Sequence, residues 1–254
     1  MKNIFTIAKN TFKESIRDKI FYTIGFFAVI FAVILFFIST ASLGEESHVL
    51  RSLGLGGVYV FGIILTILLS SSLLSKEFEK KTIYFIFSRP VTSVEMIFGK
   101  FLGLFFTLTC AITLFSGVYF LMVYLGANVF DASALLAFIL QLCEMSIFVA
   151  LTIFFSSFAR PSLSVVATVT LLYLGHSSTL LYETAVQMES TFLQTFFRGF
   201  FYIVPDLEKF NIRNSVIYNL PLSGPEIYSA ISYAVCVTFL LLGLASLFLR
   251  NREI

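Results

Sequence analysis

The chain has 254 residues, of which 58% are apolar and 13% are charged, and its mean hydropathy is +0.94. No soluble domain can accommodate so much apolar surface in contact with water, so the composition excludes a soluble protein. The net charge of +2 does not indicate a nucleic-acid partner or an acidic substrate. We therefore expect an all-α integral membrane protein with a single transmembrane domain over residues 1–254.

Residues 1–19 predict an amphipathic helix that lies along the membrane surface. Apolar side chains recur at helical spacing on one side, and basic side chains line the other. Because basic residues precede the first long apolar run, we expect no cleavable signal. The apolar set is Ile4, Phe5, Ala8, Phe12 and Ile16, and the basic set is Lys9, Lys13 and Arg17.

Six apolar segments follow, each long enough to cross a hydrocarbon core of roughly 30 Å as a helix. We expect them to be six membrane-spanning helices. A short polar loop that contains His48 and Arg51 separates the first two. The predicted spans are residues 20–42, 53–75, 98–125, 134–158, 163–182 and 227–249.

Two groups of glycines occur at the starts of predicted spans. Gly54, Gly56 and Gly57 either loosen the first turn of the second span or let another backbone approach it closely. Gly99 and Gly103 open the third span with the small-xxx-small spacing that favours tight helix packing.

Residues 183–226 are too polar to cross the membrane, and we expect an extracytoplasmic helical segment along its surface. Apolar residues between Leu193 and Phe201 lie on one helical face before Pro205. The charged residues that follow predict a solvated surface or a docking patch for an extracytoplasmic partner. They are Asp206, Glu208, Lys209 and Arg213.

The distribution of basic residues predicts the orientation. With both termini in the cytoplasm, all but four of the 17 Lys and Arg residues lie on the cytoplasmic side. This satisfies the positive-inside rule, and an even number of spans requires both termini on one side. The four exceptions are Arg51, Arg198, Lys209 and Arg213.

Glu144 is the acidic residue well inside a predicted span, where a carboxylate costs about 2.5 to 3.5 kcal/mol near the bilayer centre. It therefore needs a partner or a proton. Two interpretations remain open: a contact with a cavity or substrate, and a protonated or hydrogen-bonded residue in helix packing. Gln141, one turn earlier, shares its helical face.

His176 lies in a small polar cluster with Ser177 and Ser178 near the outer end of the fifth predicted span. A structural hydrogen bond, a role in substrate binding or pH sensing, and metal ligation are the alternatives. Neither His176 nor His48 has a second Cys or His nearby in the sequence, so no metal site is predicted.

Nucleotide chemistry is not predicted for this chain, because the sequence lacks a Gly-x-x-x-x-Gly-Lys-Ser/Thr phosphate loop. Paired acids and a Ser-His-Asp order are also absent, so we do not expect an enzyme. Any ATP must be hydrolysed by a partner.

The longest charged stretch, residues 76–97, lies between the second and third predicted spans. It begins with charges of both signs and continues into the apolar run 83–87. A contact with a partner protein and a segment lying on lipid headgroups explain this pattern equally well.

Three short motifs in and after this stretch resemble the loop signature of ABC-2 type permeases. They are Glu-Lys-Lys-Thr-Ile at 79–83, Ser-Arg-Pro-Val-Thr at 88–92 and Phe-Gly-Lys-Phe-Leu-Gly at 98–103. The predicted surface "elbow" helix, six spans and extracytoplasmic segment also resemble the plan of this family, a type V exporter fold. More narrowly, the chain is similar to the bacterial branch that includes the permease for nitrous oxide reductase maturation.

The resemblance implies a permease in the inner (cytoplasmic) membrane that forms a homodimer and exports a substrate. Two copies of a separate ATPase subunit would bind ATP and Mg²⁺, and this chain would hold no cofactor. The loop after the second span would carry a coupling helix that docks on the ATPase, and the elbow helix would also approach it. The implied coupling residues are Lys76, Glu77, Phe78, Glu79, Lys80, Lys81, Thr82, Arg89 and Pro90.

Two functions from other classes remain as alternatives. The chain is a membrane scaffold or signalling partner of an ATPase that moves no cargo, or an intramembrane enzyme that uses Glu144 and His176.

Overall fold

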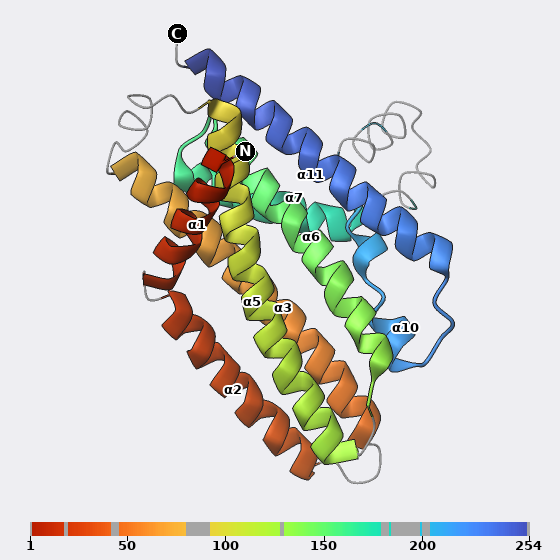
Figure 1. Ribbon diagram of the computed structural model, residues 1–254. Helices are drawn as coiled ribbons and strands as arrows, with labels where there is room; N and C mark the ends of the chain where they lie inside the picture. The colour runs from red at the N-terminus through yellow and green to blue at the C-terminus, as the bar shows by residue number, and fades with distance from the viewer. Residues whose placement is uncertain are drawn as a thin grey trace.

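The computed structural model describes residues 2–17, 20–41, 46–79, 92–127, 130–178 and 204–252, together with Glu183 and Gly199. Within these residues all the regular elements are helices (Figure 1). Their bounds are α1 Lys2–Arg17, α2 Ile20–Ala41, α3 Glu46–Glu79, α5 Ser93–Ala127, α6 Ala132–Ser156, α7 Pro161–His176, the 3₁₀ helix η1 Glu208–Phe210, α10 Arg213–Ile217 and α11 Gly224–Arg252.

Four of the described helices are long and apolar enough to cross a membrane: α3, α5, α6 and α11. A fifth span results if α1 and α2, which meet at 61°, form one bent span. Helix α7 has 16 residues, so it is about 24 Å long and shorter than the hydrocarbon core of about 30 Å. The protein is therefore a multi-pass membrane protein.

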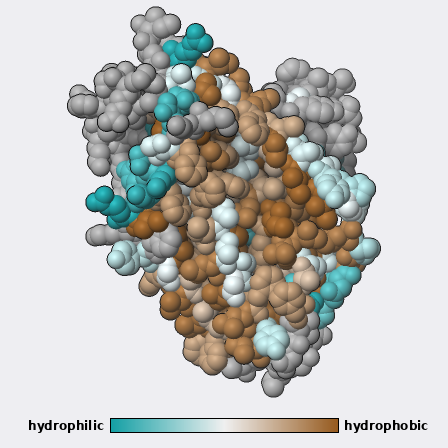
Figure 2. Space-filling view, in the orientation of Figure 1, coloured by the Kyte–Doolittle hydropathy of each residue, from teal (hydrophilic) through white to brown (hydrophobic). Residues whose placement is uncertain are grey.

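Both termini lie at one end of the bundle, together with α1, the start of α5 and the end of α3 (Figure 1). The polar surface follows the same arrangement. Figure 2 shows an apolar band across the middle of one face, with polar residues over α1 and the C-terminal end of α11 at one end and over the loop between α10 and α11 at the other. A protein that spans a bilayer requires such a band, because lipid tails contact its middle.

Helix α6 is the central helix of the bundle. In the most apolar part of α6, 72% of the residues are buried inside the protein, whereas the corresponding share is 39% in α3 and in α5 and 33% in α11. A helix that is apolar on all sides is buried by neighbours on all sides, whereas the outer helices leave one face for lipid. Polar side chains on α6 therefore face protein.

The small-xxx-small pair on α5 packs against α1. A Cβ added at Gly99 would lie 2.7 Å from the Ile7 side chain, and one at Gly103 would lie 2.7 Å from the Ala8 carbonyl oxygen. The predicted close packing is therefore confirmed, and its partner is the N-terminal helix. Asn3 adds a hydrogen bond of 3.2 Å from its Nδ2 to Oε2 of Glu95.

The glycines at the start of α3 accommodate aromatic rings, which corrects the expectation of a loosened turn or a close backbone. A Cβ at Gly54 would lie 2.6 Å from the Tyr119 ring, and one at Gly57 would lie 2.5 Å from the Phe31 ring. The helix continues through both positions.

Helix α3 is longer than the predicted second span at both ends. It begins at Glu46, so His48 and Arg51, which we expected in a polar loop, are helical. The Arg51 side chain is buried because Asp131, at the start of α6, pairs with it. At the other end the helix continues to Glu79, so residues 76–79 are helical as well.

Candidate functional site

Two helices bring polar side chains together inside the bundle. Helix α6 starts at Ala132 and ends at Ser156, so Glu144 is its middle residue, about 18 Å from either end. Helix α7 ends at His176, and this end lies beside the middle of α6. The polar site is therefore at mid-depth of a central, membrane-spanning helix.

The Glu144 carboxylate is 1% exposed and has two partners. The Tyr59 hydroxyl of α3 donates a hydrogen bond of 2.8 Å to its Oε1 atom. The same oxygen lies 2.8 Å from Nε2 of His176, and the Tyr59 hydroxyl also contacts Nε2. Three helices thus meet at one buried carboxylate, which confirms that Glu144 needs a partner.

The segment after Pro205 supplies the second half of the site. Nδ1 of His176 lies 3.4 Å from Oε2 of Glu208. Nδ2 of Asn211 donates a hydrogen bond of 2.9 Å to the other Glu208 oxygen. Oδ1 of Asn211 accepts a hydrogen bond of 2.8 Å from Nε of Arg213. The Arg213 guanidinium stacks over the Tyr59 ring, 3.7 Å from its centre.

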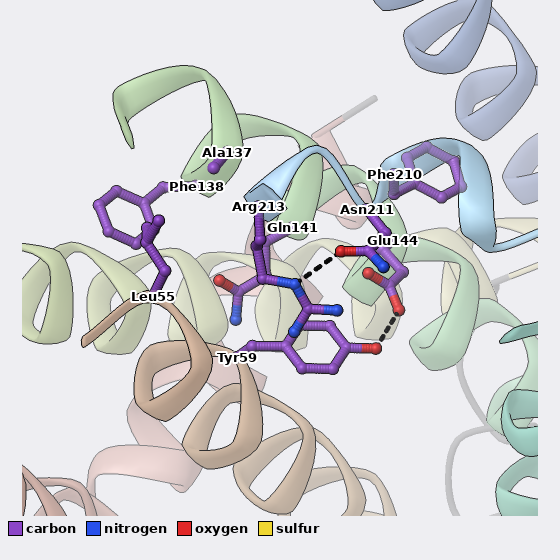
Figure 3. Close-up of a pocket in the computed structure, with 9 residues that line it drawn as sticks. All are labelled: Leu55, Tyr59, Ala137, Phe138, Gln141, Glu144, Phe210, Asn211 and Arg213. Carbon is purple, nitrogen blue, oxygen red and sulfur yellow. Dashed lines mark hydrogen bonds between the residues drawn. The ribbon is translucent and has the colours of Figure 1, made fainter. Parts of the chain in front are cut away.

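These contacts form a closed ring of six residues, each in contact with the next. Figure 3 shows Arg213 over Tyr59, with its bond to Asn211, and the bond from Tyr59 to Glu144. Cation–π stacking and charge-assisted hydrogen bonds are stronger away from water. In order, the ring is Tyr59, Glu144, His176, Glu208, Asn211 and Arg213.

The irregular backbone that carries Glu208 is held against the end of α7. A Cβ at Gly175 would lie 2.7 Å from the Pro205 carbonyl oxygen, so only glycine allows this approach. The Leu207 amide donates to the Gly175 carbonyl at 3.3 Å, and Ser178 donates to Asp206 at 3.0 Å. Non-helical backbone at membrane depth requires such cover by protein.

Gln141 lies on the same face of α6 as Glu144, as predicted, but it has a separate partner. Its Nε2 atom donates a hydrogen bond of 3.0 Å to the Val58 carbonyl on α3. A Cβ at Gly62 would lie 2.4 Å from this nitrogen, so the glycine makes room for the amide. Gln141 and Glu144, which lie one turn apart on α6, thus both bind α3.

A cavity of about 10 Å³, about the space of one water molecule, lies beside the ring, and His176 and Glu208 are not among its lining residues. Tyr59, Gln141, Glu144, Asn211 and Arg213 are among the residues that line it (Figure 3). In this conformation the site is closed to any larger molecule.

The family of the protein follows from comparison with known sequences. The model of a family described as ABC-2 family transporter protein matches residues 5–252. The chain belongs to this family. It is a membrane permease of an ABC transporter, a component that is generally not an enzyme, and its family implies an ABC ATPase as partner. No curated protein matches the chain.

The structure describes only some of the predicted coupling residues. Lys76, Glu77, Phe78 and Glu79 form the C-terminal end of α3. The others lie outside the described residues, as do the apolar residues Leu193, Phe196, Phe197, Phe200 and Phe201, so their predicted roles stay predictions. The coupling residues concerned are Lys80, Lys81, Thr82, Arg89 and Pro90.

Of the six ring residues, the sequence indicated two as site residues, Glu144 and His176. The expectation of a solvated or docking surface is wrong for Arg213, whose guanidinium stacks on Tyr59 inside the bundle. It holds in part for Glu208, whose side chain is 42% exposed but also contacts His176. Tyr59 and Asn211 were not considered. A tyrosine within an apolar span is a usable signal, since its buried hydroxyl requires a partner such as Glu144.

A second buried cluster joins the ends of α3, α5 and α6. Nε of Arg51 lies 3.4 Å from Oδ2 of Asp131, and the Tyr119 hydroxyl donates to the same oxygen at 3.0 Å. Asn219, which has a positive φ of 50°, accepts from Arg51 at 3.4 Å. This cluster fixes the ends of three helices and has a structural role.

Proposed function

We propose that the protein is the membrane subunit of an ABC exporter, driven by ATP hydrolysis in a separate ATPase subunit. One observation carries this proposal beyond family membership. Helix α3 is continuous from Tyr59, in the polar site, to Glu79, at the end of the bundle that holds both termini. About 30 Å of unbroken helix joins the two positions.

A continuous helix transmits displacement along its length, since its backbone hydrogen bonds resist bending. Movement of the polar end of α3 by the ATPase therefore moves Tyr59 relative to Glu144 and Arg213. The result is a shift between two packings of the same helices. We assign the coupling role to Lys76 through Thr82, with Arg89 and Pro90 in the loop that follows.

The wider assembly is part of the proposal. Two permease copies form a homodimer in the inner membrane, and two ATPase subunits bind ATP and Mg²⁺ at its cytoplasmic face. Helix α2 is 22 residues long, about 33 Å, which supports its count as a span of its own. With α7 as a shortened span, six spans place both termini in the cytoplasm, as the basic residues also require.

Helix α1 acts as the elbow helix in this scheme. Lys9 and Lys13 are exposed and are positioned for anionic lipid or the ATPase, while Ala8 and Thr11 pack on α5. Within the family, we propose that the chain belongs to the bacterial branch that includes the permease for nitrous oxide reductase maturation.

We place the cargo path beside Glu144, Gln141 and His176. Because the cavity there is only about 10 Å³, cargo passes only when the ring of six residues opens. The element we expect to open is segment 204–213, which is attached to the end of α7 by two side-chain contacts, His176–Glu208 and Ser178–Asp206, and by one backbone hydrogen bond, from Leu207 to Gly175.

The test is co-purification of the ATPase with the permease. The wild-type chain should retain an ATPase in stoichiometric amount, and Glu79→Lys combined with Lys80→Glu should lose most of it, since charge pairs steer docking. Glu226→Lys, at the start of α11 and distant from the end of α3, is the matched control and should retain the ATPase.

Normal retention by the double variant would contradict the coupling assignment. Cargo-stimulated ATP hydrolysis in vesicles would distinguish a transporter from a scaffold. Chemical activity of the purified chain without an ATPase would favour an intramembrane enzyme instead.

A further inference from the structure

His176 contacts two carboxylates, and these two contacts need two hydrogens. Its Nε2 and Nδ1 atoms face two carboxylates, Glu144 at 2.8 Å and Glu208 at 3.4 Å. A neutral imidazole has one N–H, and an ionised carboxylate has no hydrogen to donate. A neutral His176 between two ionised glutamates therefore has one hydrogen for two contacts, one with Glu144 and one with Glu208.

Neighbouring groups do not supply the missing hydrogen. The Tyr59 hydroxyl contacts both Oε1 of Glu144 and Nε2 of His176, so its single hydrogen does not also fill the contact between those two atoms. Asn211 donates to the Glu208 oxygen that does not face the imidazole. Arg213 binds Asn211 and stacks on Tyr59, so its charge is near the ring but bound elsewhere. Both imidazole contacts form only when the group holds one additional proton.

The other charged groups around the site are accounted for. Asp206 accepts from Ser178 and pairs with Lys209 at 3.5 Å, and Lys209 lies over the ring of Tyr233, which α11 contributes. These groups hold the segment in place without contacting the imidazole in the described part of the chain. Because the two glutamates face opposite ring nitrogens, they cannot share one metal ion with His176.

We propose that His176, Glu144 and Glu208 form a proton-binding site that takes up one proton when segment 204–213 closes and releases it when the segment opens. In the closed state the imidazole carries two N–H groups and bridges both carboxylates. In the open state the neutral imidazole keeps its bond to Glu144, and Glu208 is solvated. The proton is the only species exchanged.

Exposure determines which contact opens and where the proton enters. The Glu208 side chain is 42% exposed, His176 is 20% exposed and Glu144 is 2% exposed. Glu208 is therefore the one of the three that reaches the surface of the bundle, so the proton enters and leaves through it, and the longer contact of 3.4 Å is the one that breaks. Opening uncovers the cavity at the middle of α6.

The balance between the closed and open states depends on pH. The closed state binds one proton more than the open state, so low pH favours closure and rising pH favours opening. Above the midpoint, the ratio of open to closed protein rises about tenfold per pH unit for one proton. This is a property of the chain alone, so its test is independent of ATPase docking.

The sequence contains no tryptophan, so a single introduced one reports on the segment. Phe210, which is 3% exposed, lies on η1 and contacts the Tyr233 ring, with 6.4 Å between ring centres. We would make Phe210→Trp and, separately, Tyr233→Trp in the full-length chain in lipid nanodiscs. Emission would be measured from about pH 5 to about pH 9, the range in which histidine titrates.

Both reporters should shift to longer wavelength in a one-proton transition as pH rises. Adding Glu208→Gln should abolish the transition and keep emission at the closed value. The amide of Gln can donate to Nδ1, so both imidazole contacts form without an additional proton. Adding Glu226→Gln, the same chemical change in the first turn of α11, should leave the transition unchanged.

Flat emission from both reporters in the chain with Glu208 would overturn the proposal, and so would a transition that survives Glu208→Gln. If one tryptophan variant fails to fold, the other decides the result alone, because the two probe opposite sides of the same contact.

Discussion

Nε2 of His176 lies 2.8 Å from Oε1 of Glu144, although 32 positions separate the two residues. This contact joins the end of α7 to the middle of α6. It also explains how a carboxylate is tolerated at this depth, since a buried charge requires a partner.

Truncation at Glu144 should destabilise the protein. Glu144→Ala removes the acceptor that the Tyr59 hydroxyl and His176 Nε2 share and leaves them only their contact with each other, and a buried donor that loses its acceptor costs about 1–3 kcal/mol. Glu144→Gln retains an acceptor oxygen and should cost less. Thermal unfolding in detergent measures both, with Glu226→Ala as the control. Wild-type stability of both Glu144 variants would remove this residue from the site.

Gly175→Ala should displace the segment that carries Glu208. The added methyl group would lie 2.6 Å from the Leu207 side chain and 2.7 Å from the Pro205 carbonyl oxygen, and overpacking of this kind costs about 1–3 kcal/mol. Gly243→Ala on α11 is the matched control, because nothing lies within 4 Å of its added Cβ. A lower unfolding temperature is expected for Gly175→Ala, and equal temperatures would argue against the close packing of α7.

Gly103→Ala should loosen α1 from α5. Its Cβ would lie 2.5 Å from Thr11 and 2.7 Å from the Ala8 carbonyl oxygen, whereas a Cβ at Gly117 meets nothing within 4 Å. Trypsin should cleave at Lys9 and Lys13 faster in Gly103→Ala than in Gly117→Ala, since a detached helix exposes its backbone. If both variants are cleaved at the wild-type rate, α1 is not held by this contact.

The Arg51–Asp131 pair should behave as a buried ion pair. The Arg51 side chain is 10% exposed and the Asp131 side chain is 3% exposed. Arg51→Met leaves a buried unpaired carboxylate, which costs about 3–5 kcal/mol, and adding Asp131→Asn, which removes the charge and keeps an acceptor for the Tyr119 hydroxyl, should recover part of the loss. A double-mutant cycle of thermal unfolding measures the coupling. Additive losses would show that the two charges do not interact.

Several features of the site are evident in the sequence. Glu144 and Gln141 are polar residues three positions apart in an apolar run, so one face of that helix must contact protein. Gly99 and Gly103 indicate a close helix neighbour because their spacing returns them to the same face. Neither pattern identifies the neighbour, which proved to be α3 for Gln141 and α1 for the glycines.

The chain by itself determined that the protein lies in a membrane and that Glu144 requires a partner, because lipid cannot solvate a carboxylate. Only the tertiary structure decided that Tyr59, His176 and Glu208 meet around this carboxylate. The hydropathy pattern predicts that the charged residues after Pro205 lie in water, because it contains no information about how the helices pack. The early end of α7 leaves space beside α6, and the returning segment fills this space with Glu208 and Arg213.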